Sequence, residues 1–192
     1  MSLPRIAIVI GSTREGRFAD KPAQWIKQIA DARNDASYEI VDLRNFPLPF
    51  FEETASPAHA EPKNETARQW ARLIDGFDGY IFIAAEYNHS MTAVLKNALD
   101  YAYREFNRKP ATFIAYGGVG GARAVEQLRQ VAVELQLAPV RHAVHIGMTE
   151  FVAMLRDGKS FDDFPYLTDS AKTMLSELAW WTDALKTARE AA

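Results

Sequence analysis

The stretch RIAIVIGSTREGR, residues 5–17, joins an apolar run to a loop of unusual composition. Five of its first six residues are isoleucine, valine or alanine, which is typical of a parallel strand that is covered on both faces. The next seven residues contain two glycines, two small hydroxyl residues and two arginines, and a helical pattern follows them. A turn that only reversed the chain would not need that set. We therefore expect a buried first strand and a first loop that holds a ligand.

Similar apolar runs recur along the chain and alternate with helical patterns. Five strands that alternate with helices predict an α/β fold in which a parallel sheet has helices on both faces. We find no internal repeat, low-complexity tract or linker, so we expect residues 1–192 to form a single domain. The expected strands lie near residues 5–10, 38–43, 79–84, 111–116 and 140–146, and the expected helices near residues 18–34, 65–76, 91–105, 121–136 and 168–189.

Two segments are expected to be irregular. Residues 44–63 are proline-rich, and residues 147–165 show no clear strand or helix pattern. The second segment contains Asp157-Gly158, a pair that is typical of a hairpin turn. We expect this segment either to cover a pocket or to extend to a neighbouring molecule.

The composition limits the class of protein. The 192 residues are 48% hydrophobic and 24% charged, with a formal net charge of −3, which is ordinary for a globular protein and favours neither nucleic acid nor a membrane surface as partner. There is no cysteine, so disulfides, thiolate metal sites and cysteine nucleophiles are excluded. The N-terminal apolar run lacks a cleavage-site pattern, and no stretch approaches the ~18 apolar residues of a transmembrane helix. We expect a cytoplasmic location.

Three loops that follow predicted strands carry the unusual residues. They are GSTREGR at 11–17 (the first loop), AEYNHSMT at 85–92 (the third loop) and YGGVGGAR at 116–123 (the fourth loop). In an open parallel sheet, ligands bind outside the carboxyl ends of the strands. In the strand order 2-1-3-4-5, the first, third and fourth strands are neighbours, and these loops then form one pocket.

The first loop has the chemistry of a phosphate site. Unpaired backbone N–H groups at a helix N-terminus attract anions. Ser12 and Thr13 add hydroxyl donors, and the guanidinium groups of Arg14 and Arg17 match phosphate oxygens. The alternative is a helix cap with exposed arginines.

Two familiar nucleotide motifs do not fit this loop. Walker A requires lysine after its second glycine, but Gly16 is followed by Arg17 and Phe18. The dinucleotide fingerprint is absent as well, because four residues separate Gly11 from Gly16. Asp42 ends the second predicted strand, where a ribose-binding acid would stand, but without the glycine pattern it is better interpreted as a loop or cap residue.

The third and fourth loops favour a flat ligand. Tyr87 and Asn88 are placed to border a heterocycle, while Asn88 or Ser90 is the candidate cap of the next helix. His89 stands without a partner for base catalysis, so we do not assign it as a general base. Residues 117–121 include four glycines, which let backbone approach a ligand closely; the alternative is a flexible turn.

The segments GSTREGR, EYNHSMTAVLKNALDY and YGGVGGARAVEQLR, in this order, resemble the NADPH-dependent FMN reductase family. The resemblance covers residues 6–146 and implies a flavodoxin-like three-layer sandwich with a five-stranded parallel sheet in the order 2-1-3-4-5. It implies that the first loop binds the FMN phosphate, the third lies along the isoalloxazine and the fourth contacts its polar edge. One departure is Ala85, where the family commonly has proline. The residues expected at the cofactor are Gly11, Ser12, Thr13, Arg14, Arg17, Glu86, Tyr87, Asn88, His89, Tyr116, Gly117, Gly118, Gly120 and Gly121.

The resemblance also implies a function. It predicts an FMN-dependent NAD(P)H oxidoreductase that passes a hydride from NADPH or NADH to bound FMN and then to a small-molecule acceptor, as azo-dye, quinone and chromate reductases do. The flavin carries the chemistry, so no catalytic side chain is expected. The alternatives are an electron carrier of the flavodoxin type and a non-catalytic interaction protein with the same fold. For a 2′-phosphate of NADPH the candidate cations are Arg17, Arg104, Arg108 and Arg123.

No metal is expected either. His142 and His145 are three apart on a predicted strand, so their side chains should point to opposite faces.

The resemblance implies a homodimer or a homotetramer. The predicted helix 91–105 has a wide apolar face that includes Val94 and Leu99, although part of this face must pack on its own sheet. The aromatic pairs at residues 50–51 and 180–181 are expected to lie in the core more than at an interface.

Overall fold

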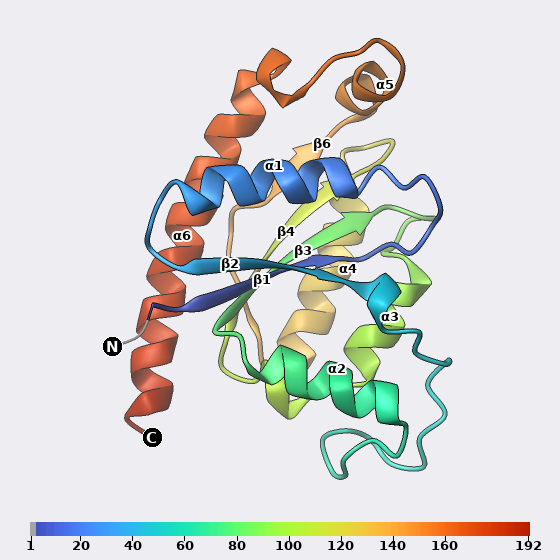
Figure 1. The fold of residues 1–192 in the computed structure, drawn as a ribbon, viewed down its shortest axis with the longest axis vertical. Helices are drawn as coiled ribbons and strands as arrows, with labels where there is room; N and C mark the ends of the chain where they lie inside the picture. Colours follow the sequence, from blue (N-terminus) through green and yellow to red (C-terminus); the bar gives the residue numbers. More distant parts are fainter. Residues whose placement is uncertain (1–2) are drawn as a thin grey trace.

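A twisted parallel sheet runs through residues 3–192, which the computed structural model describes (Figure 1). Its strands are β1 (Arg5–Ile10), β2 (Ser37–Asp42), β3 (Gly79–Ala85), β4 (Pro110–Tyr116), β5 (Ala138–Pro139) and β6 (Val144–Ile146). They take the order β2-β1-β3-β4-β5, with β6 also pairing with β4, and every pairing is parallel. The predicted order 2-1-3-4-5 is therefore confirmed.

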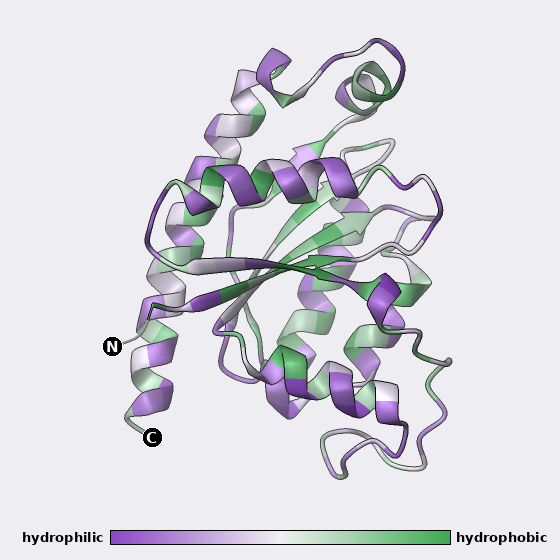
Figure 2. Ribbon diagram, viewed as in Figure 1, coloured by the Kyte–Doolittle hydropathy of each residue, from purple (hydrophilic) through white to green (hydrophobic). Residues whose placement is uncertain are grey.

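Helices cover both faces of the sheet, which confirms the three-layer sandwich (Figure 1). Alternate residues of β1 supply the two cores: Ile8 packs with one group of helices, and Val9 packs with the other. Figure 2 shows the apolar strands between helices whose outer faces are polar. The helices on one face are α1 (Asp20–Asp31) and α6 (Pro165–Glu190), and those on the other are α2 (Glu65–Asp75), α3 (Ala93–Asp100) and α4 (Ala122–Glu134).

The fifth predicted strand, 140–146, is wrong as one continuous element. The chain instead forms two short pieces, because the segment between them leaves the ladder with β4. Side chains satisfy the backbone there: Arg129 donates to the carbonyls of Val140 (2.6 Å) and Arg141 (2.8 Å), and Glu177 accepts from the backbone N–H of His142 at 2.8 Å. Hydrogen bonds from distant residues thus replace those of a sheet edge.

The helix expected at 91–105 is shorter than predicted. It begins after Thr92, whose hydroxyl accepts from the N–H of Leu95 at 3.2 Å, so Thr92 is the cap in place of Asn88 or Ser90. A separate 3-10 turn, η2 (Arg104–Phe106), follows the helix. Most of the apolar face packs against the protein's own sheet, while Val94 remains 37% exposed.

The segment 147–165, predicted to be irregular, holds a further helix. This helix is α5 (Met148–Arg156), and the short turn η3 (Phe161–Asp163) follows it; another such turn, η1 (Leu43–Asn45), follows β2. Asp157-Gly158 is no hairpin: Gly158 has a φ of +67° and ends α5, with the N–H of Lys159 bonded to the carbonyl of Ala153 at 3.3 Å. The pair is a helix-stop signal here, because glycine adopts the left-handed conformation that closes a helix.

The expectation that both aromatic pairs are core residues is wrong. Phe50 is 81% exposed and Trp180 is 65% exposed. On α6 the buried stripe follows helical spacing through Ala171, Leu175 and Leu178, and both tryptophans lie off that stripe. Within residues 3–192, no helix combines the length and the apolarity needed to cross a bilayer.

Candidate functional site

A pocket of about 400 Å³ lies at the carboxyl ends of β1, β3 and β4. All three expected loops contribute to it, and α5 forms a further wall. The pocket is thus where the strand order predicts a ligand. Its lining residues are Arg14, Gly16, Arg17, Phe18, Ala85, Glu86, Tyr87, Tyr116, Gly117, Gly118, Met148, Phe151 and Leu155.

The expected residues divide into two groups. Half of them line this pocket, and the other half do not. The expected residues outside the lining are Gly11, Ser12, Thr13, Asn88, His89, Gly120 and Gly121, of which Thr13 lines a separate cavity of about 320 Å³ beside η1 and α3.

The first loop presents unpaired backbone donors. Within residues 3–192, the backbone N–H groups of Ser12, Thr13, Glu15 and Gly16 have no hydrogen-bond acceptor. The N–H of Arg14 lies 3.4 Å from the hydroxyl oxygen of Ser12, a buried side chain. Several N–H groups in one short loop form a site for an anion such as a phosphate.

The two arginines of the first loop differ in their surroundings. The Arg14 side chain is exposed and lines the pocket, and it has no hydrogen bond or ion pair within residues 3–192. The Arg17 side chain is only 2% exposed, and its guanidinium contacts Asp42 at 2.5 and 2.7 Å and Asp20 at 2.6 and 2.9 Å. Arg17 therefore meets the protein's own carboxylates, while Arg14 is available to a ligand.

The third loop is a tight hairpin. Tyr87 and Ser90 exchange two backbone hydrogen bonds of 2.9 and 3.0 Å. Asn88 and His89 between them have φ values of +48° and +75°, as the central residues of a primed two-residue turn require. Their side chains are exposed outside the pocket lining, whereas the Tyr87 ring lines it.

Glu86 joins the third loop to the fourth. Its carboxylate accepts from the backbone N–H of Arg123 at 3.1 Å and from Nε of the same residue at 2.7 Å. Burial alone would raise the pKa of Glu86, but the hydrogen bonds and charge of Arg123 hold this pKa below its usual range. The positive end of α4 is thus occupied by a carboxylate of the protein.

The fourth loop offers backbone to the pocket. The N–H groups of Gly118 and Val119 have no acceptor within residues 3–192, and Gly118 lines the pocket. Gly121 has a φ of +70°, and a Cβ there would lie 2.5 Å from Cβ of Ala115. Packing against β4 thus requires glycine at position 121, whereas a Cβ at Gly118 would have no neighbour within 4 Å.

Aromatic and aliphatic side chains form the rest of the pocket. The ring of Phe151 on α5 stacks on Tyr116, with centroids 5.7 Å apart and planes 10° apart, and it meets Phe18 edge-on at 4.8 Å. Sequence reasoning missed Met148, Phe151 and Leu155. Their spacing of three and four residues was a usable signal of one helix face.

The two histidines have separate partners. Nδ1 of His142 lies 2.8 Å from Glu177, and Nδ1 of His145 lies 3.0 Å from the carbonyl of Gly120. Within residues 3–192, no group of three or more His, Cys, Asp or Glu side chains has the arrangement of a metal site.

Comparison with known protein sequences identifies the family of this chain. A family model described as NADPH-dependent FMN reductase matches residues 4–150. The chain belongs to this family. An NAD(P)H-dependent FMN reductase of Schizosaccharomyces pombe is 33% identical over 153 residues, which are 78% of this chain and 76% of the relative. A 2-hydroxy-1,4-benzoquinone reductase of a Burkholderia species is 34% identical over 140 residues, covering 69% of this chain and 72% of that protein.

Solved structures agree on the fold. FerB, a flavoenzyme NAD(P)H:(acceptor) oxidoreductase from Paracoccus denitrificans, aligns with a TM-score of 0.73 at 21% identity, over 95% of this chain and 98% of its own. The flavodoxin-like prediction is therefore confirmed.

The NADPH-dependent FMN reductase match covers the three loops but little of the α5 wall. The family model ends at residue 150, so most of α5 and all of α6 lie beyond it.

Ala85, the departure from the family pattern, continues β3 in register with Tyr116, and the N–H of Glu86 bonds to the carbonyl of Tyr116 at 2.9 Å. Sheet pairing thus holds the third loop without a proline.

Proposed function

We propose that this chain is an FMN-dependent NAD(P)H oxidoreductase with its flavin in the pocket described above. The observation that carries the proposal is the set of first-loop N–H groups, beside the guanidinium of Arg14, for which residues 3–192 provide no partner. These groups suit the FMN phosphate. When bound, FMN accepts a hydride from a nicotinamide and passes reducing equivalents to an acceptor.

The chain's own residues place and shield the flavin in this proposal. Gly118 and Val119 offer backbone N–H groups to the polar edge of the ring system. The rings of Tyr116 and Phe151 form an apolar wall, and burial raises the pKa of Tyr116, so its phenol stays neutral. Glu86 stays ionised against Arg123 and serves as an anchor for the two loops, without a proton-transfer role.

The rim of the pocket favours flat, apolar acceptors. Tyr87, Met148 and Leu155 line the pocket and are each 42–48% exposed. Exposed apolar side chains around a concave site suit small aromatic ligands. We therefore propose quinones as the acceptor class, in line with the quinone reductases among the relatives.

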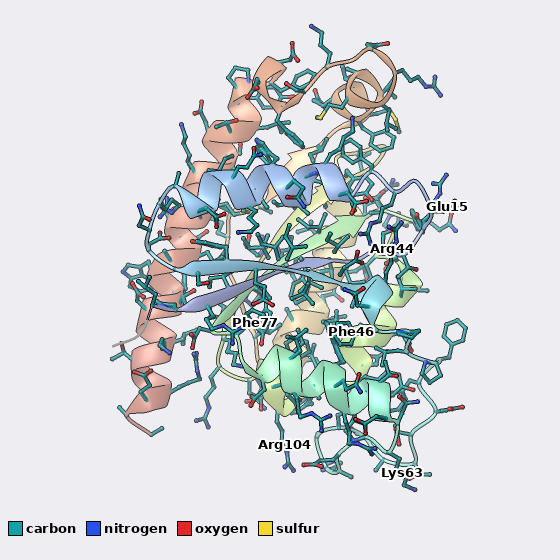
Figure 3. All side chains as sticks on the ribbon, in the orientation of Figure 1. Glu15, Arg44, Phe46, Lys63, Phe77 and Arg104 are labelled. Atoms are coloured by element: carbon teal, nitrogen blue, oxygen red, sulfur yellow. The ribbon has the colours of Figure 1, made fainter. Side chains whose placement is uncertain are left out.

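The cation for a nicotinamide 2′-phosphate is proposed to be Arg14. Arg104 donates to the carbonyl of Ala58 at 3.1 Å, far from the first loop (Figure 3). Arg108 precedes the amino end of β4, whereas the pocket lies at the carboxyl ends of the strands. Arg17 and Arg123 contact carboxylates. Because Arg14 would also contact the FMN phosphate, we expect only a weak preference for NADPH over NADH.

A second copy of the chain is proposed as partner. Phe50 and Val94 are exposed, and the carbonyl of Phe50 accepts from the hydroxyl of Tyr101 at the end of α3. A homodimer would cover these side chains; light scattering that gives a monomer would contradict this. The cytoplasmic location stays a prediction.

The test of the function is the visible spectrum of the purified protein with FMN, before and after anaerobic NADPH. Saturable binding followed by bleaching of the flavin bands is the expected result. Binding without bleaching would indicate an electron carrier that a protein partner reduces. Absence of binding would favour a non-catalytic interaction protein and overturn the proposal.

A further inference from the structure

The guanidinium of Arg17 has no donor left for a ligand. An arginine side chain carries five N–H groups. Nε and Nη2 donate to Asp20 at 2.9 and 2.6 Å, while Nη1 and Nη2 donate to Asp42 at 2.7 and 2.5 Å. The remaining Nη1 hydrogen goes to the backbone carbonyl of Ser12. Arg17 thus contacts the first loop through one of the loop's own carbonyl oxygens.

A second arginine continues this contact along the same loop. Arg44, in η1, donates from Nε to the carbonyl of Thr13 at 3.4 Å and from Nη2 to that of Arg14 at 2.5 Å. Figure 3 shows Arg44 beside the first loop, near Glu15. Three successive carbonyl oxygens, from Ser12 to Arg14, are therefore bound by two guanidinium groups.

Asp42 holds both arginines. Its carboxylate forms the two-point contact with Arg17 and also accepts from the backbone N–H of Arg44 at 2.9 Å, as the cap of η1. Burial alone would raise the pKa of Asp42, but Arg17 and the Arg44 N–H hold this pKa below its usual value. A single carboxylate at the end of β2 thus fixes the groups that hold the first loop.

This arrangement sets the direction of the loop's N–H groups. In a planar trans peptide, the C=O of one residue and the N–H of the next point in opposite directions. With the carbonyls of Ser12 and Arg14 turned toward the guanidinium groups, the N–H groups of Thr13 and Glu15 turn the other way, and both lack an acceptor within residues 3–192.

We infer that Asp42, Arg17 and Arg44 form a clamp that preorganises the first loop for the phosphate of the flavin, with Asp42 and Arg17 acting as positioning residues that do not touch it. The inference rests on the proposed function, and it reassigns Arg17 from ligand contact to loop support. Preorganised donors bind an anion more tightly because they lose less conformational entropy on binding.

The test compares FMN with riboflavin, which lacks the phosphate, in fluorescence titrations of Asp42→Asn and the wild type. Loss of the charged clamp should weaken FMN binding by about tenfold, the low end for hydrogen bonds to charged groups. Riboflavin binding should change less than twofold. Glu39→Gln is the matched control, because Glu39 is a carboxylate on the same strand that pairs with Arg5 at 3.0 Å, away from the loop; it should leave both ligands unaffected.

The sign of the effect separates the clamp from direct contact. If Arg17 bound the phosphate itself, removal of its competing carboxylate would tighten FMN binding. Tighter or unchanged FMN binding, or an equal loss for FMN and riboflavin, overturns the inference. Should Asp42→Asn fail to fold, the exposed Arg44→Ala replaces it with the same expected selective loss. If the wild type does not bind FMN, the proposed function itself is refuted. If the wild type prefers FMN to riboflavin and the variant keeps the same preference, only the clamp is refuted.

Discussion

Gly121 and Gly118 stand three residues apart in one loop, yet the structure predicts opposite consequences when each becomes alanine. At Gly121, φ is +70° and the new Cβ would lie 2.5 Å from Cβ of Ala115 and 2.7 Å from the N of Tyr116. A left-handed conformation costs about 1–2 kcal/mol for an L-residue, and overpacking adds roughly 1–3 kcal/mol. Gly121→Ala should therefore lower the free energy of unfolding by about 2–5 kcal/mol.

Gly118 provides the matched control. It has no positive φ, and a Cβ there would meet nothing within 4 Å, so Gly118→Ala should change stability by less than about 0.5 kcal/mol. Its methyl group would nevertheless stand in the pocket lining and should weaken FMN binding.

Urea unfolding of the flavin-free proteins and FMN titration of the folded ones measure the two effects separately. An unfolding midpoint of Gly121→Ala equal to that of the wild type would refute the packing of this loop on β4. Unaltered FMN affinity of Gly118→Ala would refute the close approach of the fourth loop to the flavin.

Three further predictions concern single side chains. Arg14→Ala should weaken FMN binding by about 1–3 kcal/mol in the same titration; an unchanged dissociation constant would place the phosphate elsewhere. Phe151→Ala should lower stability by roughly 1–3 kcal/mol, because its half-buried ring loses two aromatic contacts, and should preserve the preference for FMN over riboflavin. Burial lowers the pKa of Lys109 from 10.5 to about 8, so as pH rises the native state loses this proton before the unfolded state does. The wild type should therefore gain up to about 3 kcal/mol of stability relative to Lys109→Met between pH 7 and 10.5. Urea unfolding at several pH values measures this difference in the free energy of unfolding. If the difference does not change with pH, the burial of the Lys109 ammonium is contradicted.

The features that sequence reasoning predicted well are those that depend on local pattern. The apolar run of β1 indicates a strand covered on both faces, and its residues alternate between the two cores. The position of the pocket follows from strand order alone. The wall from α5 had a comparable signal in the spacing of Met148, Phe151 and Leu155, but a short helix of mixed composition is difficult to distinguish from a loop.

Two ion-pair partners at the site could not be predicted because they lie far away in sequence. Arg17 contacts Asp42, 25 residues on, and Glu86 contacts Arg123, 37 residues on. An arginine in a phosphate-type loop looks the same in sequence whether it faces a ligand or a carboxylate of its own protein. Only the folded arrangement separates Arg14 from Arg17.

The placement of these carboxylates bears on the proposed position of the phosphate. The first and fourth loops both end at the positive end of a helix, and either is a candidate anion site on dipole grounds alone. At α4 the carboxylate of Glu86 already occupies that end. At the first loop, Asp42 and Asp20 both bind the guanidinium of Arg17, and the N–H groups of Thr13 and Glu15 have no acceptor within residues 3–192. In the proposed function, the phosphate therefore binds at the first loop, and the fourth loop contacts an uncharged, hydrogen-bonding edge of the flavin.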